Sequence, residues 1–175
     1  MINIQLVDDD PAILSALKRV VHDEGWAIDT YTDPQEALVA LSINSYAVIV
    51  SDLHMPQLDG ITYLQFSKQL QPHAIRLLLS GHGDRDSLTK AINHASIYRF
   101  VSKPWDSYEL LSALRSAVEL YQLQSERRQL LDELQRQKNI IARHQNEWQQ
   151  LQKKHPALLE VLRDEDGNIL LDDDK

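Results

Sequence analysis

Five short apolar runs, separated by stretches with helical spacing, are the feature that most restricts how this chain can fold. They span residues 2–7, 27–31, 47–50, 75–79 and 98–101. The third and fourth runs are almost continuously apolar, which is typical of strands that helices cover on both faces. Strands that alternate with helices in this order predict a doubly wound parallel sheet with right-handed crossovers. The predicted fold class is therefore α/β.

The stretches between the runs carry helix signals of their own. The second helix is expected to begin at Asp33 and the fifth at Asp106, because each aspartate stands three residues before a glutamate, the spacing of a capping box. Apolar stripes at helical spacing mark two other helices. These stripes comprise Ile13, Leu17, Val20 and Val21 in the first helix and Leu88, Ala91, Ile92 and Ala95 in the fourth.

The fifth helix is expected to continue far beyond the sheet, because no Gly or Pro occurs between Trp105 and Pro156. Ten positions at alternating spacings of three and four form a stripe, which we call the seam. Seven of the ten are apolar, a pattern that predicts a coiled coil and most simply a homodimer through residues 106–155. A helix that folds back on its own domain is the alternative. The seam comprises Leu120, Leu123, Arg127, Leu130, Leu134, Gln137, Ile141, His144, Trp148 and Leu151.

The predicted organisation has three parts. Residues 1–123 form the α/β domain, residues 106–155 form the fifth helix and the coiled coil, and residues 156–175 form a tail. Asp166 and Gly167 lie between two apolar stretches of this tail, so a small hairpin is one expectation. A frayed acidic end is the other.

Composition excludes several classes of protein. The net charge is −8, which disfavours nucleic-acid binding, and the absence of cysteine excludes disulfides and thiolate chemistry. The start of the chain lacks the features of a signal peptide, and no apolar stretch is long enough to span a membrane. We therefore expect a soluble cytoplasmic protein that binds neither nucleic acid nor membrane.

Polar side chains follow four of the five predicted strands. Asp8 and Asp9 follow the first strand, Asp52 the third, Ser80 the fourth and Lys103 the fifth. The carboxyl ends of strands in an open parallel sheet converge on one crevice. We therefore expect these five side chains to lie close together. The alternative, that the aspartates are ordinary loop and cap residues, would hold for any one of them alone.

These residue types suit a divalent cation and a phosphoryl group. Magnesium prefers oxygen ligands, which Asp9, Asp52 and a backbone carbonyl just after Asp52 can supply, while Asp8 can hold a ligating water. With the cation bound, Asp52 can attack phosphorus as a carboxylate nucleophile. Lys103 can pair with the phosphoryl oxygens and Ser80 can hydrogen-bond to one of them. The sequence therefore predicts signalling by aspartyl phosphate.

The chain closely resembles the receiver domain of bacterial two-component response regulators from residue 1 to about residue 123. The resemblance implies a flavodoxin-like fold with strand order 2-1-3-4-5, phosphorylation of Asp52 by a histidine kinase or phosphotransfer protein, and Mg²⁺ as cofactor. The matching stretches are Leu-Val-Asp-Asp-Asp at 6–10, Asp-Leu-His-Met-Pro-Gln-Leu-Asp-Gly at 52–60, Leu-Ser-Gly-His-Gly at 79–83 and Phe-Val-Ser-Lys-Pro-Trp at 100–105.

The resemblance also implies roles for individual residues. Asp8, Asp9, Asp52 and the backbone carbonyl of His54 would form the metal site. Ser80 and Lys103 would bind the phosphoryl group.

Ser80 and Phe100 would form the conformational switch. A tyrosine is commoner at the position of Phe100, and the alternative is that Phe100 is only a core strand residue. Tyr98 is expected on the same strand face as Phe100.

The resulting hypothesis is a dimeric response regulator that signals through its coiled coil to an unidentified effector protein. It would have no enzymatic activity beyond slow loss of its own phosphoryl group. One alternative is a magnesium-dependent phosphatase, although His54 stands where such enzymes usually have a second aspartate. Another is the receiver half of a regulator of cyclic-di-nucleotide hydrolysis, and a third is a scaffold with a vestigial receiver.

Overall fold

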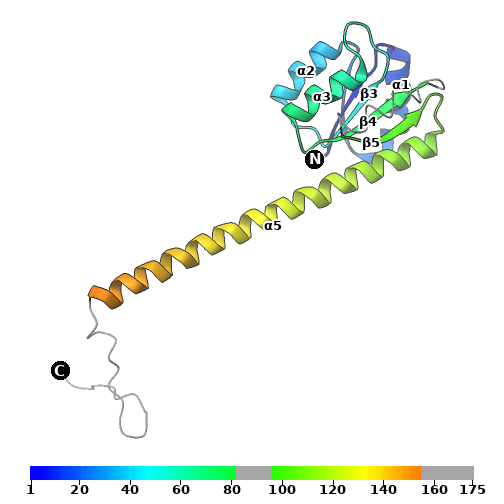
Figure 1. Ribbon diagram of the computed structural model, residues 1–175. Coiled ribbons are helices and arrows are strands. Elements are labelled where there is room, and N and C mark those ends of the chain that lie inside the picture. The colour runs from blue at the N-terminus through cyan, green and yellow to red at the C-terminus, as the bar shows by residue number, and fades with distance from the viewer. Residues whose placement is uncertain (82–95, 155–175) are drawn as a thin grey trace. The chain divides into compact units, whose positions relative to one another are not determined.

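The structure is a computed structural model, and it describes residues 1–81 and 96–154 (Figure 1). The predictions made for the fourth helix and for residues 156–175 lie outside the described residues. In chain order the elements are β1 Asn3–Val7, α1 Pro11–Val20, the short 3-10 helix η1 His22–Glu24, β2 Ala27–Tyr31, α2 Pro34–Ile43, β3 Val48–Asp52, α3 Gly60–Leu70, β4 Ile75–Ser80, β5 Ile97–Ser102 and α5 Ser107–Lys154.

The five strands form one parallel sheet in the order β2-β1-β3-β4-β5, which confirms the predicted flavodoxin-like topology. Strands β3 and β4 extend further than the apolar runs suggested. Asp52 pairs with Leu79, and Ser80 pairs with Ser102. Both polar residues are therefore the last residues of strands, and the sheet itself fixes the position of their backbones.

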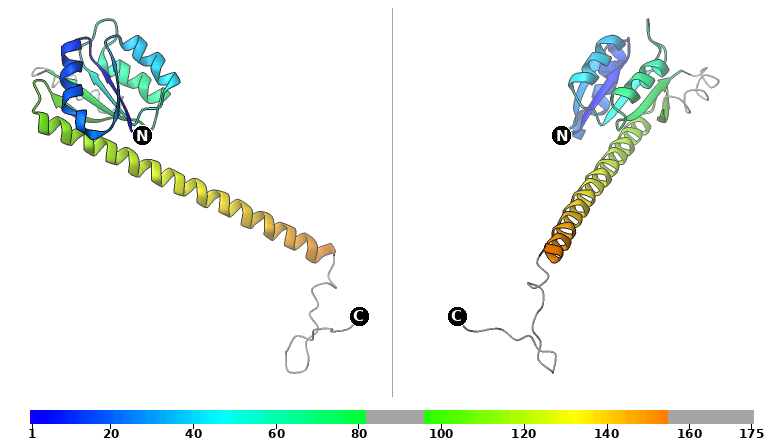
Figure 2. Two further views of the ribbon diagram at one scale, coloured as in Figure 1. Left: turned by 180° about the vertical axis from the view of Figure 1, so that it is seen from behind. Right: turned by 60° about the vertical axis from the view of Figure 1, so that its left-hand side comes forward.

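Helices cover both faces of the sheet (Figures 1 and 2). On one face, Leu14 and Leu17 of α1 and Leu114 of α5 pack against strand residues such as Val50. On the other face, Leu41 of α2 and Leu64 of α3 belong to a second cluster, which includes Ile49. Val48, Ile49 and Val50 are all at most 1% exposed, as expected for a strand covered on both sides.

Aspartates begin each of the longer helices. Asp10, Asp33 and Asp59 accept hydrogen bonds at the starts of α1, α2 and α3, from Ala12 N at 2.8 Å, Gln35 N at 2.8 Å and Thr62 N at 3.0 Å. Asp106 accepts from Tyr108 N at 2.9 Å and from Glu109 N at 3.0 Å at the start of α5. The starts predicted at Asp33 and Asp106 are therefore confirmed.

Strand β5 contains a register shift against β4. Arg76 pairs with Ile97, but the next residue, Leu77, pairs with Arg99. Tyr98 is thus an extra residue, and the alternation of side chains between faces is interrupted there.

Helix α5 is 48 residues long, as the lack of Gly and Pro predicted (Figure 2). Its first turns belong to the core of the α/β unit, where Leu110, Ala113, Leu114 and Ala117 are at most 1% exposed. Along the chain, residues Met1–Glu126 and Arg127–Lys175 form two compact units. None of the helices in the described parts of the chain is long and apolar enough to cross a membrane.

Candidate functional site

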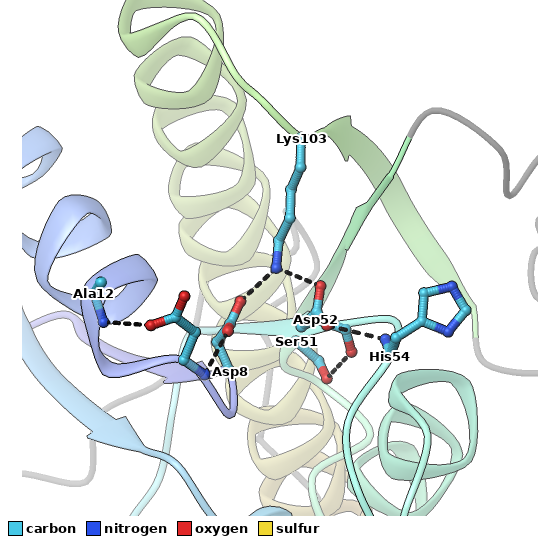
Figure 3. Close-up of polar contacts among 7 residues, drawn as sticks. Asp8, Ala12, Ser51, Asp52, His54 and Lys103 are labelled. Carbon is cyan, nitrogen blue, oxygen red and sulfur yellow. Dashed lines mark hydrogen bonds and ion pairs between the residues drawn. The ribbon is translucent and has the colours of Figure 1, made fainter.

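The carboxyl ends of β1, β3 and β5 bring three charged side chains together (Figure 3). The Lys103 ammonium Nζ lies 2.6 Å from Asp8 Oδ2 and 2.5 Å from Asp52 Oδ1. Asp8 is 1% exposed and Asp52 is 7% exposed. One ammonium therefore bridges two buried carboxylates that would otherwise repel each other.

Burial and charge act in opposite directions on these groups. Burial raises the pKa of Asp8 above its ordinary value, although hydrogen bonds from Lys103 and from the backbone of Asp10 partly offset the effect. Burial alone would lower the pKa of Lys103, but its hydrogen bonds to Asp52 and Asp8 outweigh burial and raise that pKa. Lys103 therefore stays protonated, and burial makes the ionised form of Asp8 costly to hold in this site.

The backbone around Asp52 holds its carboxylate in place. Asp52 Oδ2 accepts a hydrogen bond from His54 N at 3.0 Å, and the Ser51 hydroxyl donates to the Asp52 carbonyl at 2.9 Å. Gly60, the first residue of α3, lies directly against that carbonyl, because a Cβ atom built on it would be 1.9 Å from Asp52 O. A side chain at this position would therefore push on the backbone of Asp52.

The predicted metal ligands are only partly assembled. The side chain of Asp9 is exposed, and no group of three acidic or histidine side chains within residues 1–81 and 96–154 is arranged to hold a metal ion. The side chains present nevertheless suit a cation. Asp8 and Asp52 already converge on a positive group, the Lys103 ammonium, and all donors available there are oxygens.

The two predicted switch residues lie on neighbouring strands. Ser80 is 4% exposed at the end of β4, and its carbonyl accepts a hydrogen bond from Lys103 N at 2.7 Å. Phe100 of β5 pairs with Leu78 and packs, partly buried, against the α2–α3 side of the core. Backbone pairing thus connects the site to the strand that carries Phe100.

The prediction that Tyr98 shares a strand face with Phe100 assumes regular alternation, which the register shift at Tyr98 interrupts. Phe100 packs against the cluster that includes Leu41 and Leu64. Tyr98 lines a pocket of about 340 Å³ with Lys68 of α3 and with Leu120 and Gln124 of α5. Residues 97 and 100 pack in the same cluster for the same reason.

Two features of the site are not evident from the sequence. Asp10 stands in the motif at 6–10, but its backbone N–H donates to Asp8 Oδ1 at 3.0 Å while its side chain caps α1. Gly60 stands in the motif at 52–60, but its role is to leave space beside the Asp52 carbonyl. The adjacent aspartates and the Asp-Gly pair were visible signals, but neither spacing nor composition shows which backbone atom they contact.

Residues 4–115 match the family described as the response regulator receiver domain. This chain belongs to that family. The receiver domain is homologous to those of two-component response regulators, and this homology is consistent with phosphorelay signalling.

Two similar proteins are transcriptional regulators that extend beyond the segment similar to this chain. The hydrogenase transcriptional regulatory protein HoxA of Cupriavidus necator is 32% identical over 127 residues, which cover 73% of this chain and 26% of that protein. The transcriptional regulatory protein FixJ of Bradyrhizobium diazoefficiens is 32% identical over 66% of this chain and 56% of its own length. The chain therefore spans about a quarter to about half of the length of these regulators.

One solved receiver structure is similar to this chain over nearly its whole length. The signal receiver domain of an HD domain-containing protein from Pseudomonas fluorescens Pf-5 is 38% identical, with a TM-score of 0.69, over 72% of this chain and 93% of that chain. The similarity extends to the fold and to the sequence of the receiver.

Proposed function

We propose that Asp52 accepts a phosphoryl group from a histidine kinase or phosphotransfer protein, and that α5 passes the signal through a homodimer to an effector protein. The observation that carries this proposal is the contact of Lys103 with two buried carboxylates. A carboxylate held by the His54 amide beside the Lys103 ammonium is equipped to act as a nucleophile toward phosphorus.

In the proposed reaction, a carboxylate oxygen of Asp52 attacks phosphorus as the bond between phosphorus and the donor nitrogen breaks. The electron pair of that bond stays on the nitrogen. Lys103 moves from the carboxylates to the phosphoryl oxygens, whose charge it offsets, and the Ser80 hydroxyl donates to one of them. This chain then has no turnover of phosphate esters beyond slow loss of its own phosphoryl group.

Asp9, Asp52 and the His54 carbonyl would hold Mg²⁺, with Asp8 binding a ligating water. When bound, the ion supplies positive charge that offsets the charge of the incoming phosphoryl group. With the ion bound, Lys103 would be available to pair with the phosphoryl oxygens, because it would no longer be the cation that offsets the charges of Asp8 and Asp52.

The proposed switch begins at Ser80 and Lys103. Movement of Ser80 toward the phosphoryl group opens space beside β5 that the ring of Phe100 fills. Movement of Lys103 acts on α5 directly, since only Pro104, Trp105 and Asp106 separate Lys103 from the first residue of that helix. A small displacement at the start of α5 then passes along the helix.

The alternative function is that of a phosphatase, and the orientation of the His54 side chain disfavours it. Such enzymes need a proton donor two residues after the nucleophile. The imidazole of His54 occupies that place in sequence but points away from the Asp52 carboxylate (Figure 3). We therefore propose a phosphoacceptor that is not a phosphatase.

We propose that the effector is a protein, because the net charge of −8 opposes binding to nucleic acid. We also propose a cytoplasmic location. The similarity to a receiver from an HD domain-containing protein favours a second candidate, in which this receiver controls an HD domain. A pull-down with the beryllium fluoride complex of the protein would distinguish an HD domain protein from other effectors.

The proposal is tested by intact-mass spectrometry after incubation with acetyl phosphate and Mg²⁺. We expect one added phosphoryl group on the parent protein, none on Asp52→Asn, and none after Mg²⁺ is chelated. Asp33→Asn is the matched control, because Asp33 caps α2 outside the site and asparagine also caps helices. Phosphorylation of Asp52→Asn at the parent rate would overturn the proposal.

A further inference from the structure

Helix α5 carries an apolar stripe whose side chains are exposed over residues 123–151. Eight apolar side chains on it are more than half exposed: Leu123, Leu130, Leu131, Leu134, Ile140, Ile141, Trp148 and Leu151. Six of them are seam residues at spacings that fit a two-stranded coil. A stripe of this length exposed to water indicates that another helix packs on it.

The residues beside the seam differ in charge between its two edges. In heptad terms, the seam residues Leu134, Ile141 and Trp148 are a positions, and Leu130 and Leu151 are d positions. The g edge, just before the a positions, is largely acidic, whereas the e edge, just after the d positions, has no acid. The g edge comprises Glu126, Glu133, Ile140 and Glu147, and the e edge comprises Gln124, Leu131, Lys138 and Gln145.

This asymmetry favours one orientation of the second helix. An antiparallel pair lays g edge against g edge, so glutamates of one copy would face glutamates of the other. A parallel pair lays each g edge against the e edge of the second copy, where no acid stands. It also places Glu133 opposite Lys138 of the second copy, and the Glu133 carboxylate is held at the seam edge by a hydrogen bond from Gln137 Nε2 at 3.3 Å.

The polar residues of the seam fit the same orientation. In a parallel coil, Arg127 at an a position lies beside the g residue Glu126 of the second copy, so a buried guanidinium gains a carboxylate partner. Gln137 at a d position faces Gln137 of the second copy only when the two helices are in register. A polar seam residue that pairs with the same residue of the second copy specifies the register of the coil and lowers its stability.

We propose that the occupant of this stripe is a second copy of the chain, parallel and in register over residues 123–151. The inference rests on the proposed homodimer and adds its orientation and register. It brings the amino-terminal ends of both α5 helices together, so two receivers act on the same end of one coil.

The absence of cysteine makes the orientation testable by disulfide cross-linking of the full chain. Leu123→Cys and Leu151→Cys place thiols about 42 Å apart along α5. In the parallel coil each variant cross-links to itself on oxidation, and an equimolar mixture yields no bond between the two variants. Asn146→Cys, on the outer face of the helix, is the control and should yield no cross-link.

The possible outcomes separate this inference from the proposed function. Cross-links only between Leu123→Cys and Leu151→Cys chains would overturn the parallel orientation and leave the homodimer standing. A cross-link at residue 123 without one at residue 151 would overturn the register. A monomer mass by light scattering would overturn the homodimer itself, and phosphorylation of Asp52 would be unaffected.

A charge swap tests the edges independently. Glu133→Lys and Lys138→Glu should each raise the dissociation constant of the dimer about threefold or more, because each places like charges opposite each other at both symmetric sites. The double variant should return to within about twofold of the parent protein. Failure of the double variant to recover affinity would overturn the parallel alignment, since the two residues face each other across the coil only in that arrangement.

Discussion

At the scale of single residues, the site depends on one ammonium that serves two carboxylates. Lys103 reaches both Asp8 and Asp52, so it offsets part of the negative charge of the site before any phosphoryl group arrives. Burial still raises the pKa of Asp8, which means that the ammonium compensates for burial only in part. The residue arrangement that prepares the site for a dication therefore lowers the stability of the metal-free protein.

Replacement of Asp8 should reveal this cost. Because its pKa is raised in the folded state, the stability contribution of protonated Asp8 is present below the unfolded value of 3.8 and is lost as pH rises through the folded pKa. We expect Asp8→Asn to raise the free energy of unfolding at neutral pH by roughly 1 kcal/mol. Urea unfolding with a chelator present, measured from acid to neutral pH, checks this.

The gain from Asp8→Asn should shrink toward acid pH and should come with weaker Mg²⁺ binding. Asp9→Asn is the control, because the side chain of Asp9 is exposed and its replacement should leave the free energy of unfolding at neutral pH nearly unchanged. An Asp8→Asn protein less stable than the parent at neutral pH would show that the Lys103 bridge outweighs burial.

Gly60 affects the site by leaving space for the Asp52 backbone. Gly60→Ala would place a Cβ 1.9 Å from Asp52 O and 2.8 Å from Asp52 C, so the strand end must shift. We expect a loss of about 1–3 kcal/mol in the free energy of unfolding, together with slower phosphorylation by acetyl phosphate. Gln69→Ala, exposed on the same helix, should change neither quantity, and a Gly60→Ala protein with parent behaviour would contradict this role.

At the scale of elements, the start of α3 positions the loop that follows Asp52. Asp59 accepts hydrogen bonds from Thr62 N at 3.0 Å and from the Thr62 hydroxyl at 2.7 Å. Partial burial would raise the pKa of Asp59, but these hydrogen bonds and one from Ile61 outweigh it and lower that pKa. The ionised cap therefore stabilises the helix that begins with Gly60.

Removal of this cap should destabilise the receiver in a pH-dependent way. Asp59→Ala is expected to cost about 1 kcal/mol at neutral pH. A lowered folded pKa means that the contribution is present above the unfolded value of 3.8 and is lost as pH falls through the folded pKa. Thermal unfolding at several pH values measures it, with Asp59→Asn as the control that keeps a cap without the charge.

Strand β5 shows what the sequence could not predict at this scale. Period-two alternation places Tyr98 with Phe100, but the extra residue in β5 interrupts that alternation between Ile97 and Phe100. Neither Gly nor Pro marks the position, and tyrosine is a common strand residue, so nothing local signals the irregularity. The mismatch arises from pairing with β4, which is a long-range property.

At the scale of the whole molecule, the fold was predictable because many signals agree. The apolar runs predict the strands, the aspartate caps predict the helix starts, and the polar groups after the runs predict which edge of the sheet holds the site. The convergence of Asp8, Asp52 and Lys103 followed from topology alone. The position of Lys103 between the two carboxylates did not, because it depends on burial and side-chain distance.

The sequence also predicted the length of α5, but it did not show which partner packs on the exposed stripe of this helix. Absence of Gly and Pro predicted a long helix, and the structure shows one of 48 residues with an exposed apolar stripe. The homodimer remains a proposal that rests on this stripe.

The most direct test of the account is to locate the phosphoryl group. The protein would be phosphorylated with acetyl phosphate and Mg²⁺, reduced with borohydride, which converts an aspartyl phosphate to homoserine, and sequenced by tandem mass spectrometry. We expect homoserine at position 52 and at no other aspartate. Homoserine at position 8 or 9 instead, with residue 52 unmodified, would contradict it.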